Sequence, residues 1–272
     1  MKRAAVLGFP VHHSLSPLLH GWWLREYGVE GEYRALETDT EALGDRLKVL
    51  ADQGYQGCNL TLPLKERVLE FIDIADDSVV VSGAANTLVF ADGKIKGLNS
   101  DGFGFLESLK SQAPGWSGAR IVLIGAGGAA RSIASTLKAH ARAFALINRD
   151  QKKARKLSED LGLSAEIFDF DDRAHALPQA SLLVNCTSLG MKGQPPLDID
   201  LSRLPAHAVV CDIVYRPLQT PFLQAAAKRN LIAVEGLSML LHQGRLGFRH
   251  WFGQDPVVSA DLHAMMAREA AR

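Results

Sequence analysis

Short apolar runs alternate with amphipathic stretches along almost the whole chain. Such alternation predicts strands and helices in turn, joined by right-handed βαβ crossovers into mostly parallel sheets. In the first half, strands are expected near 3–8, 31–37 and 57–61, and helices over about 16–28 and 40–53. Ser16 is expected to cap the first helix, with Pro17 in its first turn.

The rest of the chain repeats the pattern. The segment 79–96 is predicted to be a strand pair that turns at Asp92-Gly93. A second series of strands is expected at 120–124, 143–147, 181–186, 208–213 and 231–234. The stretch 111–118, with a proline and two glycines, is the expected linker. From about Ser238 the pattern is helical, with no sixth strand expected after it.

Composition excludes several classes of protein. Of 272 residues, 47% are hydrophobic, and 30 basic residues balance 30 acidic ones. A balanced charge favours neither nucleic acid nor an anionic membrane as partner, and no apolar run approaches the roughly 18 residues of a membrane span. Cys58, Cys186 and Cys211 form no Cys-x-x-Cys pair, which is typical of reduced, buried thiols. The histidines show no metal-site spacing, so we expect no metal. The cysteine pattern and the lack of a long apolar run lead us to expect a cytoplasmic protein.

The strongest local signal is a glycine-rich turn between an apolar run and a helix. Ile121–Ile124 leads into Gly125-Ala126-Gly127-Gly128-Ala129-Ala130, the pattern Gly-x-Gly-x-x-Ala. In such a turn Gly125 permits the tight bend, Gly127 lets the backbone approach a pyrophosphate, and Ala130 allows close helix–strand packing. The helix N-terminus offers N–H groups and a positive dipole to phosphates. A plain βα turn is the alternative, but the βαβ context favours a dinucleotide site.

The end of the next predicted strand bears on which dinucleotide binds. NAD-specific sites place Asp or Glu there to accept from the ribose 2′-hydroxyl. This chain has Asn148-Arg149 instead, and Arg149 can pair with a 2′-phosphate. Lys152 and Lys153 add positive charge, so the segment favours NADP, whereas Asp150 would repel the phosphate. A solvated helix start is the alternative interpretation of this basic cluster.

Polar groups also gather at strand ends and turns, where open α/β sheets build ligand sites. These segments are 8–17, 59–65, 83–88, 97–102, 185–191, 212–217 and 235–243. Together, in this order and spacing, they closely resemble the shikimate dehydrogenase family. The resemblance extends over nearly the whole chain.

The resemblance implies an α/β fold of two domains facing across a cleft. An N-terminal mixed-sheet substrate domain would comprise residues 1–101 plus 237–272, and a Rossmann dinucleotide-binding domain would comprise residues 102–236. The implied activity is the reversible NADPH-dependent reduction of 3-dehydroshikimate to shikimate, a step in the biosynthesis of chorismate and the aromatic amino acids.

The resemblance also implies roles for individual residues. Lys65 and Asp101 would be the catalytic pair. Hydroxyl and amide side chains would bind the substrate: Ser14, Ser16 and Tyr215 at its carboxylate, and Asn59, Thr61, Asn86 and Gln243 at its ring hydroxyls. The NADP site would comprise the glycine turn, the basic cluster and a nicotinamide pocket: Gly125, Ala126, Gly127, Gly128, Ala129, Asn148, Arg149, Lys153, Thr187, Ser188, Met191, Ile213, Gly236 and Met239.

These residue types suit the chemistry. Reducing a ketone needs a hydride donor and a proton donor at the developing alkoxide. A lysine ammonium stabilises that oxyanion and supplies the proton, and a carboxylate beside it orients the amine. Ordinary structural roles are the alternatives: Ser14, Ser16 and Asp101 as helix caps, and Lys65 as an exposed lysine. His12, His13 and His20 are expected to be loop or surface groups rather than metal ligands.

The chain departs from the family pattern in a few places. Gly21, Ser100 and Arg216 are mild changes, whereas Asp150 replaces a small hydroxyl residue that helps to hold the 2′-phosphate. Asp150 therefore keeps open a related quinate/shikimate dehydrogenase that uses NAD. A dinucleotide-sensing module without catalysis is a second alternative. The sequence has no long apolar stripe or heptad repeat that would need a partner chain, so we expect a monomer or a homodimer.

Overall fold

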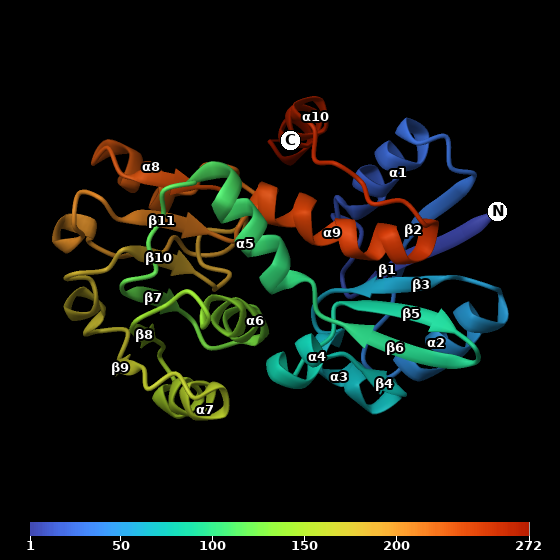
Figure 1. The fold of residues 1–272 in the computed structure, drawn as a ribbon, viewed down its shortest axis with the longest axis horizontal. Helices are drawn as coiled ribbons and strands as arrows, with labels where there is room; N and C mark the ends of the chain where they lie inside the picture. Colours follow the sequence, from blue (N-terminus) through green and yellow to red (C-terminus); the bar gives the residue numbers. More distant parts are fainter. Residues whose placement is uncertain (272) are drawn as a thin grey trace. The chain divides into compact units, whose positions relative to one another are not determined.

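The computed structural model describes residues 1–271, and the chain divides into two compact units. The first comprises Met1–Asp101 and Leu241–Glu269, and the second comprises Gly102–Leu240 and the end of the chain from Ala270. Each unit is built on a sheet of its own (Figure 1). This arrangement confirms the expected two-part α/β fold.

The sheet of the first unit is mixed. Its strands are β1 (Lys2–Gly8), β2 (Gly31–Glu37), β3 (Gly57–Leu60), β4 (Ile74–Ala75), β5 (Thr87–Ala91) and β6 (Lys94–Leu98). Within residues 1–271 their order in the sheet is β2-β1-β3-β5-β6-β4. β1 pairs in parallel with β2 and β3, whereas β5 is antiparallel to both β3 and β6.

Helices connect these strands and cover the sheet. They are α1 (Ser16–Glu26), α2 (Leu43–Asp52), α3 (Leu64–Arg67), the 3₁₀ turn η1 (Val68–Phe71), α4 (Asp77–Ser82), much of α9 (Gly236–Phe252) and α10 (Ala260–Ala270). Ser16 was expected to cap α1 but is its first helical residue instead. Its N–H donates to the Ser14 hydroxyl at 3.3 Å, so Ser14 satisfies the first N–H group of this helix.

The segment 79–82 is helical, which corrects the strand predicted there. Three consecutive valines favour a strand by β-branching. Asp76 nevertheless caps the helix by accepting from the N–H of Ser78, and Gly83 ends it in the left-handed region at φ 64°. These caps determine the local structure. The predicted strand pair is therefore confined to β5 and β6, which turn at Asp92-Gly93 as expected.

The sheet of the second unit is parallel throughout. Its strands are β7 (Ile121–Ile124), β8 (Phe144–Ile147), β9 (Glu166–Phe168), β10 (Leu182–Asn185), β11 (Val209–Asp212) and β12 (Ile232–Val234). In the described chain their order is β12-β11-β10-β7-β8-β9. Five of them lie where the apolar runs predict strands. β9 was missed because this short edge strand is only half-buried and carries a weak pattern.

Helices pack on both faces of this second sheet. They are α5 (Asp101–Gln112), α6 (Gly128–Leu137), α7 (Gln151–Leu161), the 3₁₀ turns η2 (Arg173–Ala176) and η3 (Leu201–Arg203), and α8 (Pro221–Lys228). Alternate residues of β7 enter two separate cores, one with Leu137 of α6 and the other with Phe222 of α8. Residues 111–118 lie inside this unit, so the linker expected there was placed wrongly.

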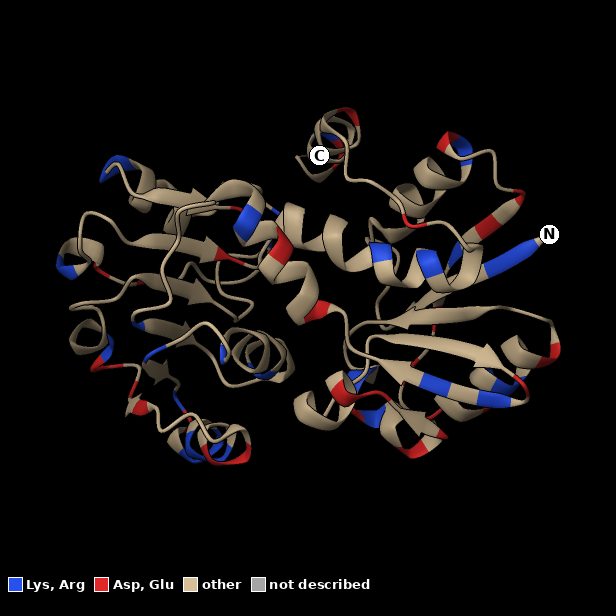
Figure 2. Ribbon diagram, in the orientation of Figure 1, with Lys and Arg blue, Asp and Glu red and all other residues tan. Residues whose placement is uncertain are grey.

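Charged residues of both signs are interspersed over each unit (Figure 2). Helix α7 carries residues of both signs, and its Lys156 pairs with Asp160 one turn later. Among residues 1–271, every helix is too short or too polar to cross a lipid bilayer.

Candidate active site

Several strand ends meet at one edge of the first sheet. β1 and β3 run in parallel and end there, and the antiparallel β5 begins at the same edge. The register places Asn59 opposite Thr87 and Thr87 opposite Leu98. The polar segments 59–65, 83–88 and 97–102 therefore converge, although they are far apart in the sequence.

Lys65 and Asp101 form a largely buried ion pair at this edge. Nζ of Lys65 lies 2.6 Å from Oδ2 of Asp101, and the two side chains are 25% and 7% exposed. Nδ2 of Asn86 donates to the other carboxylate oxygen at 2.7 Å. Asp101 is also the first residue of α5, where the helix dipole favours a carboxylate. The Asp101 carboxylate thus has two side-chain donors. A helix cap next to an unrelated exposed lysine would not show this arrangement.

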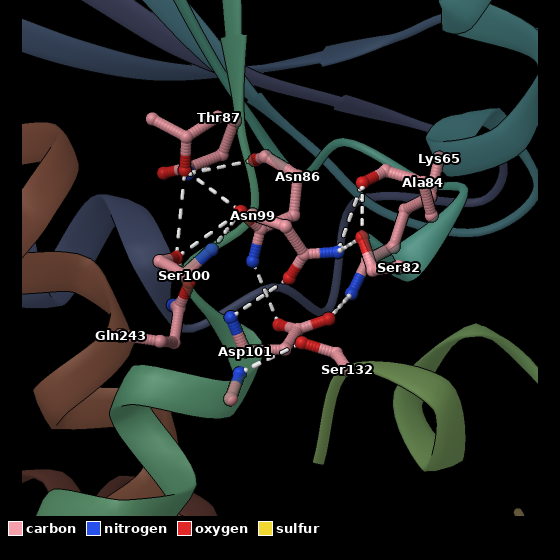
Figure 3. A network of polar contacts seen from close by, with 12 residues as sticks. Lys65, Ser82, Ala84, Asn86, Thr87, Asn99, Ser100, Asp101, Ser132 and Gln243 are labelled. Carbon is pink, nitrogen blue, oxygen red and sulfur yellow. Dashed lines mark hydrogen bonds and ion pairs between the residues drawn. The ribbon is translucent and has the colours of Figure 1, made fainter. Parts of the chain in front are cut away.

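Asn86 is the centre of the surrounding network (Figure 3). Its Oδ1 accepts from the N–H of Ser100 at 2.9 Å and from the Thr87 hydroxyl at 2.9 Å. The Ser100 hydroxyl lies 3.1 Å from the same oxygen and 3.2 Å from Oε1 of Gln243. The carboxamide of Asn86 is therefore held with its N–H groups toward Asp101.

Asn99 also holds the start of α5 (Figure 3). Its Oδ1 accepts from the N–H of Asp101 at 3.0 Å, and its Nδ2 donates to the Ser82 hydroxyl and to the Ala84 carbonyl, both at 3.0 Å. The next residue along the chain, Ala85, donates its N–H to the Lys65 carbonyl at 2.8 Å. One short segment thus fixes the backbones of both members of the ion pair.

The remaining predicted substrate residues of the first unit lie along the same edge. Asn59 is buried in β3 and donates through Nδ2 to the Asn86 carbonyl at 3.0 Å and to the Thr87 hydroxyl at 3.1 Å. Thr61 follows β3, and its N–H donates to the Leu7 carbonyl at 2.9 Å. Ser14 and Ser16 lie at the start of α1, after the parallel neighbour strand β1.

Predicted cofactor residues of the second unit lie at the carboxyl ends of its parallel strands. The chain runs outward from β7 to β9 and returns to β10 on the other side of β7. Dinucleotides bind at such a switch point. Gly125 bends directly after β7 at φ 108°, and a Cβ added there would lie 2.9 Å from Cγ2 of Thr187, which follows β10. The turns after β7 and β10 are therefore neighbours.

The glycine turn fits a phosphate group. Gly127 has extended backbone and immediately precedes α6, which begins with Gly128, Ala129 and Ala130. A Cβ added to Gly127 would meet nothing within 4 Å, so the backbone is open to a ligand at this point. Ala126 is half-buried against the core. The free N–H groups at the helix start supply donors for phosphate oxygens.

Asn148, Arg149 and Lys153 follow β8. Asn148 donates through Nδ2 to the Asp150 carbonyl at 2.7 Å. Asp150 caps α7, and its Oδ1 accepts from the N–H groups of Lys152 and Lys153 at 3.0 and 3.2 Å. Within residues 1–271, the exposed Arg149 guanidinium has no hydrogen-bond or ion-pair partner. The acidic residue is thus engaged with the helix end, while the arginine is available to an anion.

A buried network holds the loops after β10 and β11. Asn185 donates to Oδ1 of Asp212 at 2.9 Å and accepts from the Thr187 hydroxyl at 2.7 Å. The Thr220 hydroxyl donates to Oδ2 of Asp212 at 2.7 Å. Burial raises the pKa of Asp212 to about 6. These contacts fix the backbone that carries Thr187 and Ile213.

The other predicted residues of this unit are spread along the same strand ends. A Cβ added to Gly236 would lie 2.5 Å from the Ile213 carbonyl, so these two positions are adjacent. Met239 is buried one turn into α9, whereas Ser188 and Met191 are exposed after β10. Tyr215 follows β11, and burial raises the pKa of its hydroxyl.

Sequence reasoning missed part of the network. His20 was expected to be a loop or surface group but is fully buried, where its ring stacks on Tyr33. Asn99 and Thr87 lie in segments that the sequence singled out, yet their roles depend on partners far along the chain. Tyr33 is a β-strand tyrosine with no motif around it, so no sequence signal could have found it.

Fold and geometry together define a nicotinamide-dependent oxidoreductase of the α/β class. Three family models match consecutive parts of the chain: the shikimate dehydrogenase substrate binding domain over residues 6–88, shikimate / quinate 5-dehydrogenase over 107–191, and the shikimate 5'-dehydrogenase C-terminal domain over 236–266. The chain belongs to the shikimate dehydrogenase family.

Relatives match over almost their full lengths. The shikimate dehydrogenase (NADP(+)) of Dinoroseobacter shibae is 46% identical over 98% of this chain and 97% of its own, and that of Rhodospirillum rubrum is 47% identical over 96% and 95%. The structure of shikimate 5-dehydrogenase from Thermus thermophilus, in complex with NADP(H) and shikimate, has a TM-score of 0.87 and 39% identity. The match covers 99% of this chain and 100% of the Thermus thermophilus chain.

Proposed function

We propose that the chain catalyses the reversible NADPH-dependent reduction of 3-dehydroshikimate to shikimate, a step toward chorismate and the aromatic amino acids. The observation that carries the proposal is the Lys65–Asp101 pair, held by Asn86 and Asn99 in a chain of this family. A structural ion pair needs no such set of buried amides around it.

Lys65 is the proton donor in this proposal. NADPH, when bound, supplies the hydride to the ring ketone carbon. The Lys65 ammonium stabilises the negative charge that develops on the ketone oxygen and transfers one proton from Nζ to it, which yields the alcohol. Asp101 orients the amine, because its carboxylate is itself held at 2.7 Å by Asn86. In the oxidation of shikimate, Lys65 accepts the hydroxyl proton.

The substrate is a hydroxylated ring carboxylate, and uncharged side chains bind it. We assign its carboxylate to the hydroxyls of Ser14 and Ser16, with Tyr215 as a further donor because burial keeps its phenol protonated. Such charge-assisted hydrogen bonds are directional. The ring hydroxyls are assigned to Asn59, Thr61, Asn86 and Gln243.

The second unit binds NADP in this proposal. The open backbone at Gly127 and the start of α6 take the pyrophosphate, and Arg149 takes the 2′-phosphate. The carboxylate of Asp150 accepts two backbone N–H groups of α7, which offsets its repulsion of a phosphate. We assign the nicotinamide pocket to Thr187, Met191, Gly236 and Met239, with Ser188 and Ile213 as further cofactor contacts.

A comparison of initial rates tests the function. Each of shikimate and quinate is offered with NADP and with NAD, and reduced cofactor is followed by its absorbance. We expect turnover of shikimate with NADP to exceed the other three combinations at least roughly tenfold in kcat/KM, a difference of about 1.4 kcal/mol. Preferred turnover of quinate with NAD would support the quinate/shikimate alternative. Cofactor binding without any turnover would support the sensing module.

We further propose that the enzyme is cytoplasmic and works as a monomer or a homodimer. The three cysteines are buried free thiols, as is usual in a reducing compartment. Sedimentation equilibrium of the purified chain measures the oligomeric state directly.

A further inference from the structure

Tyr33 contacts one of the residues assigned to the substrate. Its hydroxyl donates to Oδ1 of Asn59 at 2.6 Å. The register explains how a side chain on β2 reaches β3. Tyr33 lies opposite Ala4 of β1, and Ala4 lies opposite Gly57 of β3, so small residues leave room across the sheet. Asn59 is two residues beyond Gly57 and therefore on the same face.

The carboxamide of Asn59 has almost no hydrogen-bonding capacity left. Both N–H groups of Nδ2 are used, one by the Asn86 carbonyl and one by the Thr87 hydroxyl. Oδ1 accepts from Tyr33, and one lone pair of Oδ1 remains. Asn59 can therefore meet a ligand only as an acceptor.

An aromatic cluster holds the phenol ring in place. The ring of His20 stacks on Tyr33 with centroids 4.0 Å apart and planes 6° apart, and Trp251 packs against both rings in a tilted orientation. In the described chain, neither ring nitrogen of His20 has a hydrogen-bond partner. Burial lowers the pKa of His20 to about 3, so the imidazole is neutral at physiological pH. His20 thus acts on Tyr33 by packing alone.

We propose that Tyr33 is a positioning residue, whose hydroxyl holds the Asn59 carboxamide with Oδ1 presented to a hydroxyl group of the substrate. The Oδ1 acceptor of Asn59 then favours a substrate ring with a free hydroxyl group over a ring in which that group is missing or O-alkylated. The inference rests on the proposed function, because Asn59 is a substrate residue only in that reading.

Tyr33→Phe tests the proposal, because it removes the hydroxyl and keeps the ring and its stack on His20. The matched control is Tyr55→Phe, which removes the same atom from another buried tyrosine of the first unit, one that packs against Arg3. For Tyr33→Phe we expect the KM for shikimate to rise about tenfold, as for the loss of one net hydrogen bond. kcat should stay within about twofold and the KM for NADP should not change. Tyr55→Phe should match the wild type.

A double-mutant cycle separates positioning from general stability. In an Asn59→Ala background, Tyr33→Phe should have no further effect on the KM for shikimate, because the group that it positions is gone. An unchanged KM in the single variant would overturn the proposal, as would an equal rise in the KM for NADP or an effect that persists without Asn59.

The wild-type assay keeps the two proposals distinguishable. If the wild type oxidises shikimate and Tyr33→Phe has the same KM, this inference fails and the proposed function stands. If the wild type does not oxidise shikimate, the proposed function fails. Whether Tyr33 holds the Asn59 carboxamide is then decided by NMR of the Asn59 side-chain amide, whose two proton resonances should shift in Tyr33→Phe and not in Tyr55→Phe. Unshifted resonances would overturn it.

Discussion

Asp101 is almost buried, and a carboxylate in such a place costs free energy unless donors surround it. Lys65 and Asn86 supply those donors within 2.7 Å. Replacing a buried ion pair by apolar side chains is often neutral or even stabilising. The pair is therefore better explained by the chemistry proposed for it than by any contribution to stability.

His20 predicts how stability depends on pH. Burial lowers its pKa from the usual 6.5 to about 3, so between these values the unfolded chain binds a proton that the folded chain refuses. The stability contributed by neutral His20 is complete above pH 6.5 and is lost as the pH falls toward 3. From about pH 7.5 to about pH 5 this single group should lower the free energy of unfolding by about 2 kcal/mol.

Urea unfolding of the wild type and of His20→Phe at these two pH values measures the contribution. Phenylalanine keeps a ring against Tyr33 but cannot titrate, so the variant should lose about 2 kcal/mol less on acidification. A cost of overpacking would appear equally at both pH values and cancel in this comparison. Identical losses in the two proteins would show that His20 takes up its proton in the folded state.

At this scale the sequence predicts residue types better than partners. Lys65, Asn86 and Asp101 could be named because each lies in a short motif at a strand end. Asn99 and Tyr33 could not be given roles, since their partners come from other strands and only register brings them together. His20 was placed wrongly because a single histidine within a predicted helix carries no sign of the aromatic cluster that buries it.

The turn between β7 and α6 gives a prediction at the scale of elements. Gly127 has extended backbone, and a Cβ there would meet nothing within 4 Å. Gly127→Ala should therefore fold with an unchanged melting temperature. If the pyrophosphate lies against this backbone, the added methyl group should raise the KM for NADP at least about tenfold, about 1.4 kcal/mol, with little change in kcat.

Gly115→Ala is the matched control, because a Cβ at that exposed position also meets nothing within 4 Å. It should leave both the melting temperature and the KM for NADP unchanged. If Gly127→Ala bound NADP as tightly as this control, the pyrophosphate could not lie at the turn.

Elements with a clear period were predictable, and those set by end effects were not. Apolar runs located most strands to within a residue or two. α4 was missed because its valines favour a strand, whereas the cap at Asp76 and the left-handed Gly83 make it a helix. β9 was missed because an edge strand of three residues shows almost no alternation.

For the whole molecule, the chain passes from the first unit to the second at the start of α5 and returns inside α9. Hydrophobic periodicity continues through a helix without interruption, so a boundary within one leaves no mark in the sequence. The proline and glycines of 111–118 predicted a linker, but they mark a turn within one unit. Tertiary contacts, rather than local composition, define these units.

The central claim is that Lys65 transfers the proton in shikimate oxidation, and the kinetics of Lys65→Ala test it most directly. Lys65→Arg is measured beside it, because arginine keeps a charge next to Asp101 but does not give up its proton. Lys48→Ala, at an exposed lysine of the first unit, is the control. We predict that kcat falls about 10²–10⁴-fold in both Lys65 variants while the KM for shikimate changes only a few-fold. A kcat near that of the wild type, with only KM raised, would contradict the claim.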